Sequence, residues 1–172
     1  LGQFSKKYVL YLQGTGLPVL CLDFQYRGVE ADSVVSGSFQ ASYYLTSHLI
    51  DRGHRRIAFV GNLNYTNSVN DRYLGYYKAL LEEGINLDSR YRIDDRGQQG
   101  ILERYALPEE MPTAFVCNND HAAYLLIRQL RVFEDVVSSR RVNFQVLVRL
   151  DGLCHRIDDL SHDIAVDARL LL

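Results

Sequence analysis

Apolar residues along this chain follow two spacings, one typical of helices and the other of buried strands. Between residues 40 and 52, apolar or aromatic side chains recur at helical intervals, which predicts one buried stripe made of Ala41, Tyr44, Leu45, His48 and Leu49. Gly53 follows at the position where a left-handed residue ends many helices. Residues 57–60 are wholly apolar, as in a strand buried on both faces of a parallel sheet. The centre of the chain is therefore predicted to be a helix, a tight turn and a buried strand.

The same two patterns continue on both sides of this central unit. We expect a helix capped by Ser5, and strands at 17–23, 33–36, 90–95, 113–117 and 142–150. Further helices are expected at 71–83, at 99–106 and after the polar turn at 118–120. The helix at 71–83 is expected to begin on a capping Asp71 and to bury Leu74, Tyr77 and Leu81. This alternation predicts an α/β fold with a mainly parallel sheet flanked by helices.

Composition and charge narrow the class of protein. The 172 residues are 47% hydrophobic with a formal net charge of -2, which is ordinary for a soluble globular protein. Near-neutral charge argues against a nucleic-acid-binding surface on this segment, because such a surface needs clustered Lys and Arg. No apolar run approaches the roughly 18 residues of a membrane helix, so no membrane partner is expected. Of the three cysteines, Cys21 and Cys117 lie in apolar runs, which favours buried free thiols in a reducing compartment over disulfides.

Catalytic and metal-binding patterns are absent from the sequence. There is no phosphate-binding glycine loop and no nucleophile elbow. The only loose metal set has no known ligand spacing, and a solvated loop explains it better; its members are His155, Asp158, Asp159, His162 and Asp163. We therefore expect no catalytic residues, no cofactor and no metal.

Polar side chains follow the predicted strands, at the edge where open α/β sheets bind ligands. Amides, carboxylates and a guanidinium that converge there can hydrogen-bond a polyhydroxyl ligand. The candidate ligand-binding residues are Gln40, Arg72, Asn119, Asp120 and Asp151. The alternative is that such residues are caps and turns, with Asn119 and Asp71 the clearest cases, or that Arg72 only pairs with Asp71 or Glu82 on its own helix.

Several stretches of the sequence, taken in order along the chain, also match the sequence pattern of a known protein family. They are residues 16–23 (GLPVLCLD), 31–36 (ADSVVS), 48–61 (HLIDRGHRRIAFVG), 71–85 (DRYLGYYKALLEEGI) and 112–120 (PTAFVCNND). Together they resemble the effector-binding domain of the LacI/GalR family of bacterial transcription regulators. Residues 149–152 (RLDG) resemble the family's next strand end, and 167–172 (DARLLL) the segment that returns to the first lobe.

The resemblance implies a two-lobed, periplasmic-binding-protein-like fold. Residues 1–61 and 164–172 would form a first, incomplete lobe, and residues 62–163 the second. A sugar or nucleoside-like effector would bind between the lobes of a cytoplasmic homodimer, and a helix-turn-helix domain outside this chain would bind operator DNA. Arg72 is similar to the arginine that grips the effector, Asn119 and Asp120 to the second-lobe Asn-Asp pair, Asp151 to the strand-end aspartate and Gln40 to the polar residue lining the first lobe.

Two departures from the family pattern concern the effector. Residues 94–100 hold no aromatic where some members stack one on the sugar, and Arg149 stands where glycine is usual. A second hypothesis, a free solute-binding protein feeding a transporter, shares the fold. Unpaired cysteines and the Gly-His-Arg-Arg run at 53–56 favour the regulator.

Overall fold

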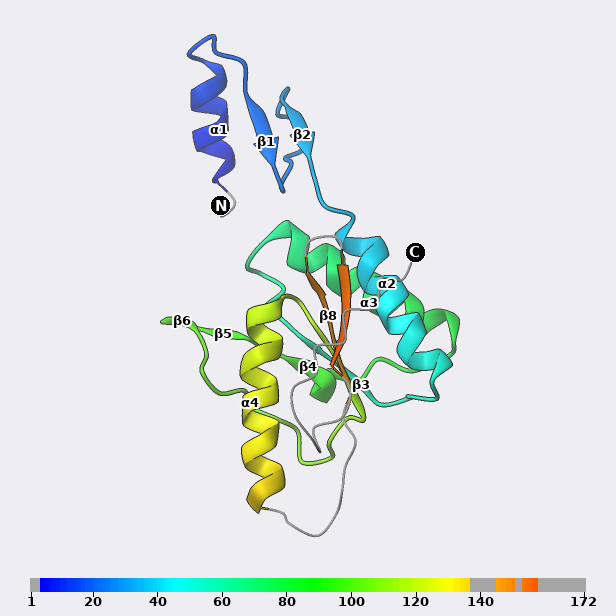
Figure 1. Ribbon diagram of the computed structural model, residues 1–172. Coiled ribbons are helices and arrows are strands. Elements are labelled where there is room, and N and C mark those ends of the chain that lie inside the picture. Colours follow the sequence, from blue (N-terminus) through cyan, green and yellow to red (C-terminus); the bar gives the residue numbers. More distant parts are fainter. Residues whose placement is uncertain (1–3, 137–144, 151–152, 158–172) are drawn as a thin grey trace.

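The computed structural model describes residues 4–136, 145–150 and 153–157. They form an N-terminal unit and a larger α/β unit, which Figure 1 shows joined by the chain that leaves β2. The N-terminal unit consists of α1 (Lys6–Gln13), β1 (Leu20–Leu22) and β2 (Asp32–Val34), and its two strands are parallel. Val9, Cys21 and Phe24 form its small core between α1 and the strands.

The larger unit is built on a five-stranded sheet with the strand order β4-β3-β7-β8-β9. The strands are β3 (Ile57–Val60), β4 (Arg92–Ile93), β7 (Ala114–Cys117), β8 (Gln145–Leu150) and β9 (Leu153–Ile157). All pair in parallel except β9, which is antiparallel to β8. The helices are α2 (Ser38–Asp51), α3 (Asn67–Glu82) and α4 (Asp120–Val136), with a 3-10 turn at Ser89–Tyr91. A small hairpin of β5 (Arg96–Gly97) and β6 (Gly100–Ile101) extends from the loop after β4.

The two central strands are buried on both faces, as their uniformly apolar sequences predict. Ile57 and Phe59 pack in one core with residues of α2 and α3, whereas Ala58 and Val60 pack in the other core with residues of α4. Figure 1 shows α4 on one side of the strands and α2 and α3 on the other. The described residues thus form three layers, and the predicted α/β class with parallel strands flanked by helices is confirmed.

The central helix-turn-strand unit also matches its prediction. Gly53 has a φ of 90°, so it takes the left-handed conformation expected after the end of α2. Ser5 accepts a hydrogen bond from the Tyr8 backbone N–H and caps α1 as expected. Cys21 and Cys117 are buried free thiols, while the side chain of Cys154 lies outside the described residues.

The expected division of the chain after residue 61 does not follow the sheet. β3 lies between β4 and β7, and α2 packs on the same sheet. The structure therefore groups residues 38–61 with the larger unit, because parallel pairing places β3 at its centre. The expected return of 164–172 to the first lobe falls outside the described residues.

Three helix predictions are corrected. α3 begins at Asn67 and is capped by Thr66, whose hydroxyl accepts from the Val69 N–H, so Asp71 is not the cap. Its buried face carries Val69, Gly75, Tyr76, Ala79 and Leu80, and the predicted stripe of Leu74, Tyr77 and Leu81 is exposed.

Residues 99–106 contain β6 and bends instead of the predicted helix. In α2, Tyr44 likewise faces solvent although the predicted stripe included it.

Within the described ranges, no helix combines the length and the apolarity needed to cross a membrane.

Candidate ligand-binding site

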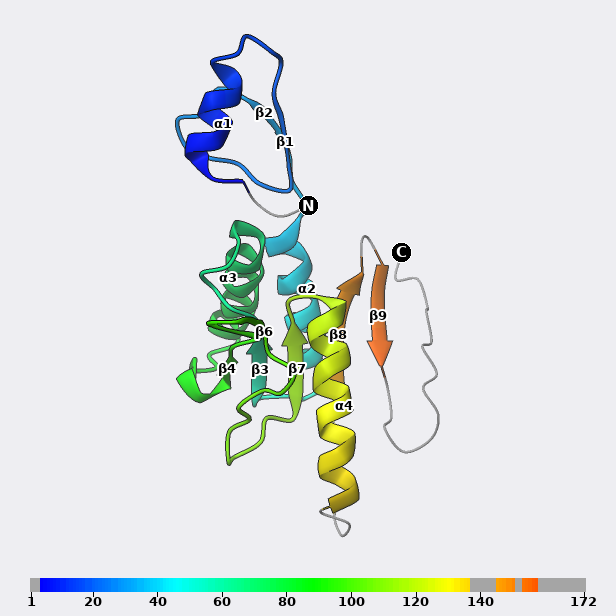
Figure 2. The same cartoon turned by 90° about the vertical axis from the view of Figure 1, so that its left-hand side faces the viewer.

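The parallel strands β3, β4 and β7 end at the same edge of the sheet, which we call the strand-end edge. Arg72 follows β3 along the chain, and Asn119 and Asp120 follow β7. The registers join these ends closely: the Gly61 N–H donates to the Ile93 carbonyl at 2.9 Å, and the Asn118 N–H donates to the Val60 carbonyl at 2.9 Å. Figure 2 shows β7 pointing toward the N-terminal unit. The loops after these strands therefore lie on the side of the sheet that faces that unit.

Asp95 is the centre of a buried polar cluster at this edge. Its side chain is almost fully buried, with 3% exposed. One carboxylate oxygen accepts from the Asn62 backbone N–H at 2.8 Å, and the other accepts from the Asn118 side-chain amide at 2.8 Å. Asp95 thus ties the ends of β3 and β7 together, and these hydrogen bonds offset the cost of burying a carboxylate.

Gly61 allows this cluster to pack so tightly. A Cβ at this position would lie 2.7 Å from the Asn118 side-chain nitrogen, closer than real Cβ contacts come. The Asn118 side-chain oxygen is buried and accepts no hydrogen bond from the described protein groups. The Asn118 oxygen is therefore enclosed at the strand-end edge, out of contact with solvent.

An arginine and a tyrosine stack beside the cluster. The Arg96 guanidinium carbon lies 3.7 Å from the centroid of the Tyr65 ring, and Arg96 Nε lies 3.9 Å from an Asp95 carboxylate oxygen. Tyr65 is 55% exposed, whereas only 20% of the Arg96 side chain is. Such a cation–π pair holds the guanidinium in a fixed plane, ready to present its outer N–H groups to an acceptor.

The N-terminal unit contributes its own strand-end loop. Asp23, directly after β1, has a φ of 64° and accepts a hydrogen bond from the Ser36 hydroxyl at 2.7 Å. The Asn67 side chain, in the first turn of α3, donates to the Gln25 carbonyl at 3.2 Å. This contact joins the loop after β1 to the start of α3, so strand-end loops of both units meet at one place.

The structure describes Gln40, Arg72, Asn119 and Asp120 of the five sequence-predicted residues, and their surroundings differ. Arg72 lies in the second turn of α3 and is half-buried, and Gln40 is exposed in the first turn of α2. The Asn119 side chain accepts from the Ala122 N–H at 2.8 Å, so it does cap the start of α4, and Asp120 is exposed beside it. Asp151 lies outside the described residues. Ligand binding by these five residues stays a prediction.

Four residues of this edge were missing from the predicted site, namely Asn62, Tyr65, Asp95 and Arg96. A signal for Asp95 was present, since it is the last residue of the strand predicted at 90–95 and so lies at a strand end, where Asn119 was also expected. Tyr65 supplies an aromatic ring at this edge, whereas the family pattern led us to look for such a ring only in residues 94–100. It comes from the loop before α3, about 30 residues away along the chain.

The titratable groups at this edge do not resemble a catalytic set. Burial, together with the nearby Asp95 carboxylate, raises the pKa of the Cys117 thiol. A raised pKa keeps the thiol neutral and unreactive. Burial also raises the pKa of Tyr105, whose hydroxyl donates to the Ala122 carbonyl at 3.2 Å. No group of three or more His, Cys, Asp or Glu side chains among the described residues could hold a metal ion.

The sequence model of the periplasmic binding protein-like domain family matches residues 46–132, half of this chain. The chain belongs to this family. The matched residues include β3, α3, β4, β7 and most of α4, and hence the strand-end edge.

The relatives of this periplasmic binding protein-like domain are transcriptional repressors. It is 25% identical over 125 residues to the "HTH-type transcriptional repressor PurR" of Glaesserella parasuis serovar 5, covering 70% of this chain and 37% of that protein. It is 30% identical over 142 residues to the "Arabinose metabolism transcriptional repressor" of Geobacillus stearothermophilus, covering 76% of this chain and 38% of that protein. The chain thus spans well under half the length of these curated relatives.

A solved structure with the same fold gives a consistent result. The sugar-binding transcriptional regulator of the LacI family from Escherichia coli, complexed with phosphate, has a TM-score of 0.63 and 25% identity, covering 84% of this chain and 52% of that chain. Together these comparisons confirm the LacI/GalR effector-binding domain and the periplasmic-binding-protein-like fold.

Proposed function

We propose that this chain is the effector-binding part of a LacI/GalR-type transcriptional regulator, with the effector at the strand-end edge between the two units. The observation that carries the proposal is the meeting of β3, β4 and β7 ends with the loop after β1 at one edge, around the buried Asp95 cluster. Open α/β sheets bind their ligands at such an edge. The relatives are repressors, which favours a regulator over a transporter's solute-binding protein.

The polar groups at this edge favour an effector rich in hydroxyl groups. Arg72, Arg96 and Asn119 offer donors, while Asp120 offers acceptors. A sugar presents both kinds of group on every hydroxyl. The Tyr65 ring gives it an exposed apolar face to lie against. One solved relative in fold, a LacI-family regulator of Enterococcus faecium, contains bound ribose.

The remaining parts of the proposal concern the whole regulator. Effector binding would shift the affinity for operator DNA of a helix-turn-helix domain outside this chain, in a cytoplasmic homodimer without membrane contact. No catalytic step and no cofactor belong to this function, because sensing requires only a difference in affinity between two states.

The test is ligand-induced stabilisation of this chain in the presence of D-ribose, L-arabinose and a panel of hexoses and nucleosides. An effector at a hundred times its dissociation constant adds about 2.7 kcal/mol of stability, which a thermal-shift measurement detects. Arg72→Ala is expected to weaken binding of that effector by about one to two decades, because hydrogen bonds to a charged group contribute about 1.5–3 kcal/mol.

Arg128→Ala is the matched control for Arg72→Ala. Arg128 is an exposed arginine on α4, eight residues beyond the helix start and hence about 12 Å from the strand ends. Its removal should leave affinity unchanged. Equal effector affinity in folded Arg72→Ala protein would remove Arg72 from the site, and absence of stabilisation by every compound would count against a sugar or nucleoside effector.

A further inference from the structure

A pocket lies at the edge of the sheet opposite the strand ends, beside the amino-terminal end of β3. Its volume is about 280 Å³. Its walls come from the turn before β3, the second half of α3, residues 85–91 and the loop at Glu110. Because β3 runs from this pocket toward the strand-end edge, the two sites are separated by the length of the strand.

The floor of this pocket is apolar. Ile57, Tyr76 and Leu80 are buried there, with Ile85 partly buried beside them. The Tyr76 hydroxyl is already used, since it donates to the Ile57 carbonyl at 2.8 Å. The floor therefore offers a ligand hydrophobic contact and no hydrogen-bonding group of its own.

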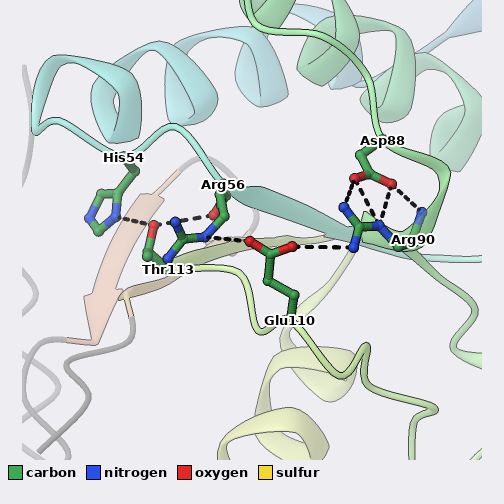
Figure 3. A network of polar contacts seen from close by, with 6 residues as sticks. All are labelled: His54, Arg56, Asp88, Arg90, Glu110 and Thr113. Atoms are coloured by element: carbon green, nitrogen blue, oxygen red, sulfur yellow. Dashed lines mark hydrogen bonds and ion pairs between the residues drawn. The ribbon is translucent and has the colours of Figure 1, made fainter.

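The rim is charged, and its groups are unequally engaged (Figure 3). Arg90 is firmly held: its Nε lies 3.1 and 3.0 Å from the two Asp88 oxygens, and its Nη2 lies 2.6 Å from one of them. These hydrogen bonds hold the pKa of Asp88 below its usual range. Arg90 also donates to Glu110 at 3.2 Å. Asp88, Arg90 and Glu110 thus form a fixed group on one side of the pocket.

Arg55 and Arg56 are held much more loosely. Arg55 lies 3.7 Å from a Glu83 oxygen and Arg56 lies 4.0 Å from a Glu110 oxygen, and more than half of each arginine side chain is exposed. Exposed pairs at such distances contribute little to stability, so these guanidinium groups can turn to an incoming anion at small cost. The Arg56 backbone, by contrast, is fixed, because its carbonyl accepts from the Thr113 N–H at 2.8 Å.

Tyr91 provides a second recognition group in the wall of the pocket. It is 7% exposed, and its buried hydroxyl has no hydrogen-bond partner among the described residues. Burial, with Glu110 nearby, raises the pKa of Tyr91, so the hydroxyl remains a neutral donor. The Arg90 guanidinium carbon lies 5.8 Å from the centroid of the Tyr91 ring, and Arg56 lines the same pocket, so the ring lies beside the basic rim. A buried donor without an acceptor is costly, and a ligand oxyanion would satisfy it.

We propose that this pocket binds a small organic acid, with its carboxylate on Arg56 and the Tyr91 hydroxyl and its apolar body on Ile57 and Leu80. Charge alone does not define the site, because the carboxylates of Asp88 and Glu110 line the pocket beside the arginines. The apolar floor distinguishes an organic acid from a bare inorganic anion. A pocket of this volume accommodates a body of the size of a benzene ring.

The test is an amide NMR titration of the whole chain with sodium benzoate, with benzamide and inorganic phosphate as matched probes. Benzamide keeps the ring without the charge, and phosphate keeps the charge without the ring. Benzoate should cause saturable shifts at the amides of residues 55–57 and 85–91, with affinity at least about tenfold above that of either control. Shifts that do not saturate, or equal affinity for phosphate, would overturn the proposal.

Two variants separate recognition from the structural role of the ion pairs. Arg56→Gln should weaken benzoate binding by about tenfold or more, and Tyr91→Phe by about three- to tenfold, since the ring and its packing remain. Arg104→Gln, an exposed arginine outside the pocket, should change nothing. Unchanged benzoate affinity in a folded Arg56→Gln protein would show that the rim only clamps the loops together.

Discussion

Asp95 shows how a single buried charge can organise a site. Its carboxylate accepts from two donors that come from the ends of different strands, Asn62 and Asn118. Replacing it by an apolar residue would leave both donors buried without acceptors, which is more costly than the loss of the two bonds themselves. Asp95 therefore fixes the relative positions of the loops that would contact an effector, without having to contact the effector itself.

Asp88 gives a prediction about pH. Arg90 lowers the pKa of this half-buried carboxylate, so its contribution to stability is fully present above the unfolded-state pKa, about 3.9, and is lost as the pH falls through the lower folded value. We expect Asp88→Asn to destabilise the chain at neutral pH, and the difference from wild type to disappear as the pH falls through the lowered pKa of Asp88. Asparagine keeps the acceptor for the Arg90 N–H, so the turn is preserved.

The measurement is the free energy of urea unfolding of both proteins between neutral and acid pH. Asp71→Asn is the control, because Asp71 is an exposed aspartate on α3 that caps nothing in the structure. A wild-type advantage over Asp88→Asn that stays constant down to the lowest pH would contradict the electrostatic explanation.

A residue's role can be predicted from the sequence when the contacts that determine it are made with neighbours along the chain. The Ser5 cap and the left-handed Gly53 depend on neighbours within one turn, and both were predicted correctly. The Arg96–Tyr65 stack joins residues from two loops that only the folded sheet brings together. Local patterns do not contain this information. Asn119 lies between these cases, since its capping role is local and its predicted contact with an effector is not.

At the element scale, Gly75 determines how α2 and α3 pack. A Cβ on Gly75 would lie 2.1 Å from the Phe39 carbonyl oxygen and 2.9 Å from the Tyr43 nitrogen, both backbone atoms of α2. No rotation of a side chain relieves contacts with backbone, so the helices would have to separate. The glycine is therefore the reason that these two helices approach closely over one face of the sheet.

Gly75→Ala tests this packing. Alanine favours a helix over glycine by about 1 kcal/mol, but forcing the helices apart costs about 1–3 kcal/mol or more. We expect a net loss of unfolding free energy in urea denaturation. Leu74→Ala, a substitution at the neighbouring exposed position, should change stability by about 0.5 kcal/mol or less. A more stable Gly75→Ala protein would show that the helices can separate freely.

The same contact explains why the buried face of α3 was predicted wrongly. Leu74, Tyr77 and Leu81 have helical spacing, and so do Val69, Tyr76 and Leu80, so periodicity alone permits either stripe. The approach of α2 at Gly75 selects the second stripe and leaves the first in solvent. By contrast, the strands β3 and β7 are apolar at every position, which leaves no choice of face, and they were predicted correctly.

For the whole molecule, the two units meet at the strand-end edge while the rest of the N-terminal unit stays apart (Figure 1). The chain passes once between them within the described residues, after β2, and the Asn67–Gln25 hydrogen bond adds a polar contact. Such a narrow connection allows the units to close on a ligand. An effector that binds the closed state better than the open state shifts the population toward the closed state. This is the property that a regulator's sensing domain requires.

Aromatic side chains on α1 suggest where two copies of the regulator meet. Tyr8 and Tyr11 have stacked rings with centroids 6.4 Å apart, and they are 46% and 68% exposed. Tyrosine is enriched at protein interfaces, because its ring is apolar and its hydroxyl tolerates water. We predict that the full-length protein is a homodimer and that α1 contributes to its interface.

Tyr11→Glu in the full-length protein tests this prediction by sedimentation at micromolar concentration. In a two-fold symmetric dimer the substitution changes the interface twice, and one interface aromatic contributes about 2 kcal/mol, so the dimer dissociation constant should rise by at least about thirtyfold. Tyr44→Glu is the matched control, because Tyr44 is similarly exposed, at 62%, on α2 of the larger unit. A wild-type monomer would contradict the dimer, whereas a dimer that both substitutions leave intact would place the interface away from α1.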